Sequence, residues 1–257
     1  MLISPRIPPT ALVTGGARRI GRGVVLALAE AGFSVAIHCN ASREAADETA
    51  CAVRAMGVRA EVLQAPLGDE AAVRGLMSRA TEALGPIGVL VNNASTFERD
   101  EWHDSTRESW DAHIEPNLRA PFVLIQDFAR ALPTDAEGLV VNLLDERVWS
   151  LTPHFVSYTV SKAALWTLTQ TMALALAPRI RVNGIGPGPT VPSPRQTLAQ
   201  FEAQCASVPL RHGSSPEEIG QAVLAMLHLP SYTGQMMALD GGQHLQWSPA
   251  GSSALEE

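Results

Sequence analysis

Short apolar runs alternate with longer amphipathic segments along most of the chain. Runs of about four to eight apolar residues are typical of buried strands, and helices between consecutive strands make those strands parallel. The pattern therefore predicts an α/β fold, with one parallel sheet covered by helices on both faces. The expected strands are residues 11–14, 34–38, 59–64, 87–91, 138–144, 179–185 and 235–238. The expected helices are residues 21–31, 43–56, 69–84, 107–132 (interrupted near Pro116 and Pro121), 156–177 and 216–227.

The sequence contains no internal repeat and no shift of composition that would mark a domain boundary. We therefore expect one domain over residues 1–257, with loosely held ends at residues 1–9 and 248–257. Residues 189–209 are rich in proline around a short helical pattern, and they are long for a connection. We expect this segment, called the lid below, to cover a site, and an irregular linker is the alternative.

Composition excludes several classes of function. The 257 residues include 19 basic and 26 acidic side chains, a net charge of −7, whereas a nucleic-acid-binding protein needs a basic face. No apolar run approaches the roughly 18 residues that cross a membrane, and the first residues do not resemble a secretory signal, so we expect a cytoplasmic protein. The three cysteines are scattered, and the histidines and aspartates of residues 103–113 lack ligand spacing, so we expect no metal.

A glycine-rich turn, residues 14–21 (TGGARRIG), joins the first expected strand to the first helix. Such a turn directs backbone N–H groups and a helix N-terminus at a pyrophosphate. Arg18, Arg19 and Arg22 lie where the helix dipole disfavours cations, and a bound polyanion would reverse that cost. The turn therefore predicts a dinucleotide cofactor.

The end of the second strand indicates which dinucleotide is bound. An NAD site usually places an acidic residue there for the ribose 2′-hydroxyl. This chain instead has His38, Asn40, Ser42 and Arg43, and a hydroxyl with a guanidinium suits a 2′-phosphate. We therefore expect NADPH. Capping of the following helix is the alternative role for Ser42.

Lys162 is the only lysine in the chain, and it lies four residues after Tyr158, one of two tyrosines. On a helix this spacing puts both side chains on one face. An ammonium beside a phenol favours the phenolate, which suits acid–base catalysis, and a compact ammonium can also hold a ribose hydroxyl.

Taken together, these motifs resemble the short-chain dehydrogenase/reductase family over about residues 8–245. The resemblance rests on the glycine turn, Asn92-Asn93-Ala94, the Tyr158/Lys162 pair, Pro187-Gly188 and Asp240-Gly241-Gly242. It implies a single Rossmann-type, doubly wound domain with a seven-stranded parallel sheet, assembled as a homotetramer. It also implies that Asn117 supports a proton-relay water. The residues expected to bind NADPH are Gly15, Arg18, Arg19, Ile20, Gly21, His38, Asn40, Ser42, Arg43, Leu67, Asn93, Ala94, Ser95, Tyr158, Lys162, Pro187, Gly188 and Thr190.

Three departures from the family pattern narrow the resemblance. Arg19 and Ser95 stand where the family usually has glycine, and Asp145 stands where it usually has serine, 13 residues before Tyr158. With Phe97, these residues resemble the pteridine reductases and the related dihydromonapterin reductases. That resemblance implies catalysis by Asp145, Tyr158, Lys162 and Asn117. It implies a pterin substrate, dihydropterin or dihydrofolate, held by Phe97, Ser95, Arg19, Asp145 and Tyr158.

Other interpretations stay open at this stage. The chain is alternatively a carbonyl or 3-oxoacyl reductase of the same family, or a catalytically idle NADP-binding protein. Phe97 is alternatively a core residue, Asp145 a turn residue at a strand end, and Arg19 a cofactor ligand only. Pro66 stands where the family usually has an aspartate that meets the adenine, so adenine binding would rely on the backbone of Leu67.

Overall fold

The computed structural model describes residues 3–246 and contains one sheet of seven parallel strands in the order β3-β2-β1-β4-β5-β6-β7. The strands are β1 (Thr10–Val13), β2 (Ser34–Cys39), β3 (Ala60–Gln64), β4 (Val89–Asn92), β5 (Gly138–Leu143), β6 (Ile180–Pro187) and β7 (Met236–Leu239). The predicted α/β fold, with seven parallel strands in one sheet, is confirmed.

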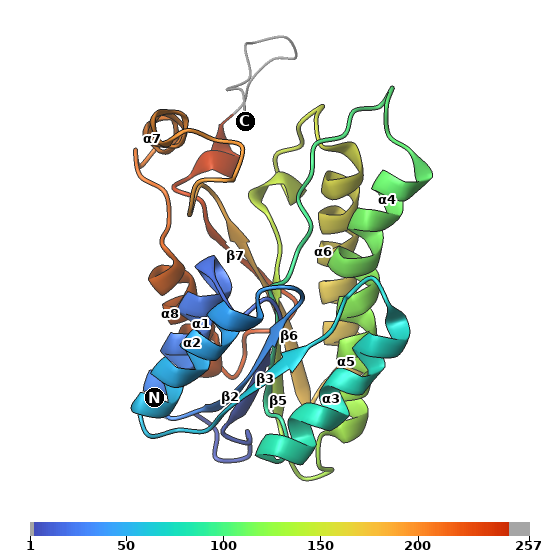
Figure 1. The fold of residues 1–257 in the computed structure, drawn as a ribbon, viewed down its shortest axis with the longest axis vertical. Coiled ribbons are helices and arrows are strands. Elements are labelled where there is room, and N and C mark those ends of the chain that lie inside the picture. Colours follow the sequence, from blue (N-terminus) through green and yellow to red (C-terminus); the bar gives the residue numbers. More distant parts are fainter. Residues whose placement is uncertain (1–2, 247–257) are drawn as a thin grey trace.

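Helices cover both faces of the sheet (Figure 1). One face packs against α1 (Arg19–Glu30), α2 (Arg43–Ala55) and α8 (Pro216–Leu227). The other face packs against α3 (Glu70–Leu84), α5 (Ala120–Ala131) and α6 (Val156–Leu176). The remaining helical elements are α4 (Arg107–Ile114), the π-helical turn η1 (Glu115–Arg119), α7 (Leu198–Ser207), and the short turns η2 (Glu146–Val148) and η3 (Gln243–Leu245).

Alternate residues of each strand belong to two different cores, one on each face of the sheet. Val13 and Val35 belong to the core beneath α1, α2 and α8, whereas their neighbours Leu12 and Ala36 belong to the core beneath α3, α5 and α6. Successive side chains of a strand point to opposite faces, and here both faces are covered. For this reason the strands are continuously apolar rather than alternating.

Proline explains the interruption of the helical stretch at 107–132. Pro116 has no N–H group, so it cannot continue the α-helical hydrogen-bond ladder. The chain forms the π-helical turn η1 there, and the Ala120 N–H group bonds to Glu115 O, five residues back. Pro121 lies in the first turn of α5, where the missing N–H group is tolerated.

Part of the expected loose N-terminal end is packed in the structure. Ile7 is buried in the core beneath α1, and Arg6 O accepts a hydrogen bond from the Glu137 N–H group at 3.0 Å. Arg6 also forms an ion pair with Glu137. The sequence showed only prolines and polar residues near Ile7 and did not reveal this distant partner. The other expected loose end, residues 248–257, lies outside the described residues.

The strand order reverses direction between β1 and β4. In open parallel sheets, ligands bind beyond the carboxyl ends of the strands at such a reversal. The glycine turn follows β1, Asn93 follows β4, Asp145 follows β5, and the lid follows β6. The topology therefore brings the predicted site segments to one edge of the sheet.

Candidate active site

A cavity lies at this edge of the sheet, beneath the lid. Its lining includes Arg19, Ser95, Phe97, Asp145, Tyr158 and Lys162. Ile20, Asn93, Pro187, Gly188 and Thr190 also line it. Residues expected to bind cofactor or substrate, from the loops after β1, β4, β5 and β6, therefore line one cavity.

Close packing explains the glycines of the turn after β1. Gly15 has a φ of +63°, in the left-handed region that glycine adopts readily. A Cβ atom at Gly21 would stand 2.1 Å from Gly15 O, so α1 starts directly against the turn. The first N–H groups of α1 therefore lie close to the turn, an arrangement that suits a pyrophosphate.

Arg19 adopts an unusual backbone conformation in this turn. Its φ of +53° explains why glycine is common there, because a side chain in this region is strained. Its guanidinium donates hydrogen bonds to Pro192 O at 2.8 Å and Val191 O at 3.3 Å. Arg19 lines the cavity, but in this structure its hydrogen bonds go to the lid.

Thr14 and Asn93 tie the glycine turn to the end of β4. The Thr14 hydroxyl accepts hydrogen bonds from the N–H groups of Asn93, at 2.9 Å, and Ala94, at 3.0 Å. The Asn93 amide donates to Thr14 O at 2.9 Å and Gly15 O at 3.2 Å. The Asn93 side chain thus supports the turn.

His38, which is predicted to contact the cofactor, also holds the glycine turn in place. It is buried, its Nδ1 atom accepts from the Gly15 N–H group at 3.1 Å, and its Nε2 atom lies 2.9 Å from Ala65 O. Burial lowers the pKa of His38, which favours the neutral ring with its proton on Nε2. Both ring nitrogens are therefore used to support the glycine turn and the end of β3.

The predicted 2′-phosphate residues, Ser42 and Arg43, lie where α2 begins. Ser42 precedes α2 but makes no capping hydrogen bond with its side chain, and Arg43 is exposed and paired with Asp47 at 3.0 Å. A second hollow between the two helix starts is lined by residues that include Arg18 and Arg22. The guanidinium groups of these two arginines have no hydrogen-bond or ion-pair partner within residues 3–246, so they are available to an anion, although Glu44 and Glu48 line the same hollow.

The remaining predicted cofactor residues follow the ends of β2, β3 and β6. The backbone carbonyl of Asn40 accepts a hydrogen bond from Gln64 at 2.7 Å. Leu67 is buried, whereas Pro66 beside it is exposed. On the lid side, the Thr190 hydroxyl donates to Gly188 O at 3.0 Å and lies 2.7 Å from the Ser214 hydroxyl.

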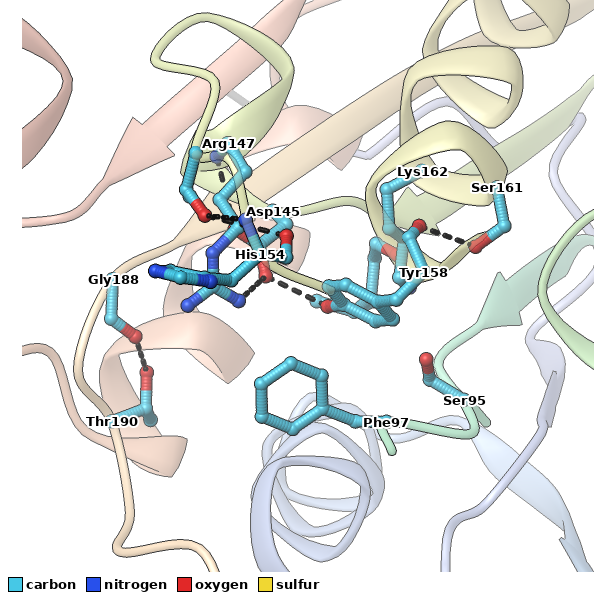
Figure 2. A network of polar contacts seen from close by, with 12 residues as sticks. Ser95, Phe97, Asp145, Arg147, His154, Tyr158, Ser161, Lys162, Gly188 and Thr190 are labelled. Carbon is cyan, nitrogen blue, oxygen red and sulfur yellow. Dashed lines mark hydrogen bonds and ion pairs between the residues drawn. The ribbon is translucent and has the colours of Figure 1, made fainter. Parts of the chain in front are cut away.

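Tyr158 and Asp145 are in direct contact. The Tyr158 hydroxyl donates a hydrogen bond of 2.7 Å to Asp145 Oδ2, and Figure 2 shows Tyr158, Asp145 and Arg147 pointing toward one another. Asp145 follows β5 and Tyr158 belongs to the first turn of α6. A phenol and a carboxylate at this distance can exchange a proton.

Lys162 lies behind this pair, fully enclosed by protein. Its Nζ atom donates to Leu143 O at 2.7 Å and lies 5.8 Å from the centre of the Tyr158 ring. Burial lowers the pKa of Lys162 to about 8, and the negative charge of Asp145 partly opposes that effect. The ammonium is therefore close to its titration range at physiological pH.

Asn117, which is predicted to support a proton-relay water, has a side-chain amide that is bonded within the protein. It is buried in η1, and its Oδ1 atom accepts from the Thr96 N–H group at 2.8 Å and the Ser95 hydroxyl at 3.1 Å. Its Nδ2 atom donates to Thr96 O at 2.9 Å and the Ser161 hydroxyl at 3.0 Å. All four hydrogen-bonding positions of the amide are used. The side chain of Asn117 thus joins the segment after β4 to helix α6.

Phe97 lies at the cavity rather than in the core. Its ring stacks on that of Phe155, with centres 4.7 Å apart and an interplanar angle of 13°, and it meets the Tyr158 ring at 4.6 Å and 63°. Phe97 is half-buried and lines the cavity. Its position therefore suits stacking against a flat ligand.

Sequence reasoning missed four residues that support this arrangement. Phe155 forms the other half of the aromatic stack, with a φ of +56° just before α6. Arg195 of the lid donates to Phe97 O at 3.0 Å and pairs with Glu98. Asp100 accepts from the Ser157 N–H group at 3.2 Å, and Arg147 lies beside Asp145. An aromatic residue three positions before Tyr158 was the one available signal.

His113, one of the histidines to which no metal was assigned from the sequence, is buried and bonded within the protein. Its Nε2 atom accepts from the Glu98 N–H group at 3.0 Å, and its Nδ1 atom lies 2.7 Å from the Ser157 hydroxyl. Within residues 3–246, no three histidine, cysteine, aspartate or glutamate side chains lie close enough together to hold a metal ion. No helix in the same part of the chain is long and apolar enough to cross a membrane.

Comparison with known proteins identifies relatives of this chain. The family model described as short chain dehydrogenase matches residues 9–203. The 3-oxoacyl-[acyl-carrier-protein] reductase of Staphylococcus aureus is 30% identical over 245 residues, which cover 93% of this chain and all of that protein.

Two solved structures are similar over nearly the whole chain. One is the FolM alternative dihydrofolate reductase 1 of Brucella canis complexed with NADP, with a TM-score of 0.93 and 48% identity, covering 97% of this chain and 100% of that one. The other is the Brucella suis protein of the same name, also with NADP, with a TM-score of 0.91 and 50% identity, covering 94% of this chain and 97% of that one.

Proposed function

The chain belongs to the short-chain dehydrogenase family, and from that membership we propose that it is an NADPH-dependent reductase that converts a dihydropterin or dihydrofolate to the tetrahydro form. The observation that carries the proposal is the 2.7 Å hydrogen bond between Tyr158 and Asp145 beside the ring of Phe97. This combination offers an acid–base pair and a stacking surface in one cavity.

The residues of the turn and the lid fit an NADPH molecule. Gly15 and Gly21 let the turn pack directly against the start of α1, whose first N–H groups suit a pyrophosphate, and Arg18 and Arg22 are available to a 2′-phosphate. Thr190 and Lys162 would meet the nicotinamide end. NADPH, when bound, supplies the hydride.

The substrate side of the cavity suits a flat heterocycle. Phe97 offers a ring for stacking, and the carboxylate of Asp145 can accept hydrogen bonds from the amino and ring N–H groups of a pterin. Ser95 lines the same cavity. A ketone carbonyl has no N–H group to offer Asp145, so the carboxylate favours the pterin.

Proton delivery falls to Tyr158 and Asp145. Reduction of a C=N bond adds hydride to carbon and leaves negative charge on the adjacent nitrogen, where a proton must arrive. The Tyr158 hydroxyl gives up that proton, and Asp145 can restore it once the carboxylate has itself taken a proton from water, because the two groups share a hydrogen bond. The positive charge of Lys162 favours the phenolate that remains on Tyr158.

The names of the similar proteins favour two different substrates. The two Brucella structures, at 48% and 50% identity, are called alternative dihydrofolate reductases, which supports the pterin proposal. The Staphylococcus aureus protein, at 30% identity, is a 3-oxoacyl reductase. Reduction of a 3-oxoacyl thioester is therefore the second candidate function, and Asp145 in place of a hydroxyl is the observation against it.

A parallel assay separates the candidates. The decrease of NADPH absorbance is followed with dihydrobiopterin, dihydrofolate and a 3-oxoacyl thioester under the same conditions. We expect turnover of the two dihydropterins and a kcat/KM for the thioester lower by at least about 100-fold. Turnover of the thioester alone would establish the second candidate. NADPH binding without turnover of any substrate would indicate an idle nucleotide-binding protein.

A further inference from the structure

Arg147, two residues after Asp145, contacts Asp145 and the rings of Phe97 and Phe155 on the substrate side of the cavity. We propose that Arg147 is a positioning residue that fixes the Asp145 carboxylate against the Tyr158 hydroxyl and holds the Phe97–Phe155 stack beside it. The inference deepens the proposed function and rests on it for the roles of Tyr158 and Asp145. It depends on two sets of contacts and on the burial of the charged pair.

In the first set of contacts, the two carboxylate oxygens of Asp145 have different hydrogen-bond partners. Asp145 precedes the turn η2, and its Oδ1 atom accepts a hydrogen bond of 2.9 Å from the Arg147 N–H group. This leaves Oδ2 directed to the Tyr158 hydroxyl at 2.7 Å. The Nη1 atom of Arg147 lies 3.8 Å from the same Oδ2 atom. Main chain and side chain of Arg147 thus act on opposite ends of one carboxylate (Figure 2).

The second contacts are with the aromatic stack. The guanidinium carbon of Arg147 lies 5.3 Å from the ring centre of Phe97 and 5.2 Å from that of Phe155. Because the two distances are nearly equal, the guanidinium lies beside the stack rather than over either ring. Arg147 therefore joins the acid–base pair to the stacking surface.

Burial makes the ion pair electrostatically effective. The side chain of Arg147 is 10% exposed and that of Asp145 is 17% exposed, so water screens their charges weakly. A carboxylate alone beside Tyr158 would oppose the phenolate by like-charge repulsion. The positive charge of Arg147 offsets this repulsion, and Lys162 acts in the same sense from α6.

The other charged or titratable groups around this pair come from several elements. Glu146 of η2 lines the same cavity, His113 of α4 has its ring centre 6.1 Å from that of Tyr158, and Arg195 of the lid lies 5.1 Å from the Phe97 ring centre. Arg195 borders the stack as Arg147 does, but it pairs with Glu98 instead of Asp145. It therefore serves as a matched control.

The composition of the chain allows a direct test. The only tyrosines are Tyr158 and Tyr232, so the Tyr232→Phe protein has Tyr158 as its single phenol. Its ultraviolet titration then reports the charge around Tyr158 without substrate. Arg147→Gln and Arg147→Met remove the charge with different shapes, Arg147→Lys keeps it, and Arg195→Gln is the control. Thermal unfolding and NADPH binding of each variant verify its fold.

We expect the phenol titration midpoint to rise by about one pH unit in the Gln and Met variants, and to stay near the parent value in Arg147→Lys and Arg195→Gln. Equal midpoints in the parent and in folded Arg147→Gln or Arg147→Met would overturn the role, as would an equal rise in Arg195→Gln. The titration needs no turnover, so a chain that failed to reduce pterins would still test Arg147. Conversely, pterin turnover with unchanged midpoints would leave the proposed function standing.

Discussion

Lys162 combines a charge that catalysis requires with an enclosed position. Because burial lowers the pKa of Lys162 to about 8, the ammonium loses its proton as the pH rises through that value. The charge that favours the Tyr158 phenolate is then lost. We expect kcat/KM for the dihydropterin to fall above about pH 8, by up to tenfold for each pH unit. A pH profile that stays level to about pH 10 would contradict this role of Lys162.

The same burial predicts how stability depends on pH. Between about pH 8 and 10.5, the folded state holds Lys162 neutral while the unfolded state still binds the proton. The unfolded state then binds more protons, so the contribution of Lys162 to the free energy of unfolding rises with pH in this range. Urea denaturation at several pH values should show a rise that Lys162→Met lacks. Parallel curves for the two proteins would refute it.

Asp145 distinguishes this site from one that uses a hydroxyl. Asp145→Ser restores the residue usual in the family and removes the carboxylate that is bonded to Tyr158. We expect kcat/KM for dihydropterin to fall by at least about 100-fold, because a proton-transfer partner is lost. The dissociation constant for NADPH, measured by fluorescence, should stay within about twofold. An equal loss in both quantities would mean that Asp145 is structural.

At the scale of elements, the start of α6 depends on a residue from a different loop. Asp100 accepts hydrogen bonds from the Ser157 N–H group at 3.2 and 3.4 Å, and it is 4% exposed. We expect Asp100→Ala to lower the free energy of unfolding by about 1–2 kcal/mol, as the loss of a helix cap does. Tyr158 follows Ser157, so kcat should fall as well.

Asp111 supplies the matched control for this prediction. It forms an exposed ion pair with Arg107 on α4, and such pairs contribute about 0.5 kcal/mol or less. Urea denaturation of Asp100→Ala and Asp111→Ala, side by side, makes the comparison. If the two variants lose equal stability, Asp100 does not cap α6 in solution.

The sequence predicted most elements because their determinants are local. Buried strands and amphipathic helices leave apolar patterns, and Pro116 marked the interruption that became η1. The pairing of Tyr158 with Asp145 was also accessible, through the resemblance to a known family. The contact of Arg195 with Glu98 was not, because it spans 97 residues and depends on how the lid folds back.

Residue type alone did not reveal the contacts of two polar side chains. His38 and Asn117 carry polar groups that suit a cofactor or a water, but the fold uses those groups to join its own segments. A buried polar side chain must satisfy its hydrogen bonds, and the partners here are backbone groups and hydroxyls from other segments of the chain. Such partners cannot be identified before the topology is known.

At the scale of the whole molecule, α6 indicates how copies of the chain would assemble. Leu174 is 84% exposed and Val160 is 40% exposed, and their spacing of 14 residues places both on one face of the helix. A second copy of the chain would cover this face in the expected homotetramer. We expect Leu174→Glu to lower the mass measured by light scattering. A monomeric parent protein would refute the assembly.

A crystal structure of the chain with NADP and a dihydropterin tests the proposed site most directly. We expect the pterin ring to stack on Phe97, with its N–H groups within about 3 Å of Asp145 and Tyr158. A pterin bound away from Phe97, or held without contact to Asp145, would contradict the proposal.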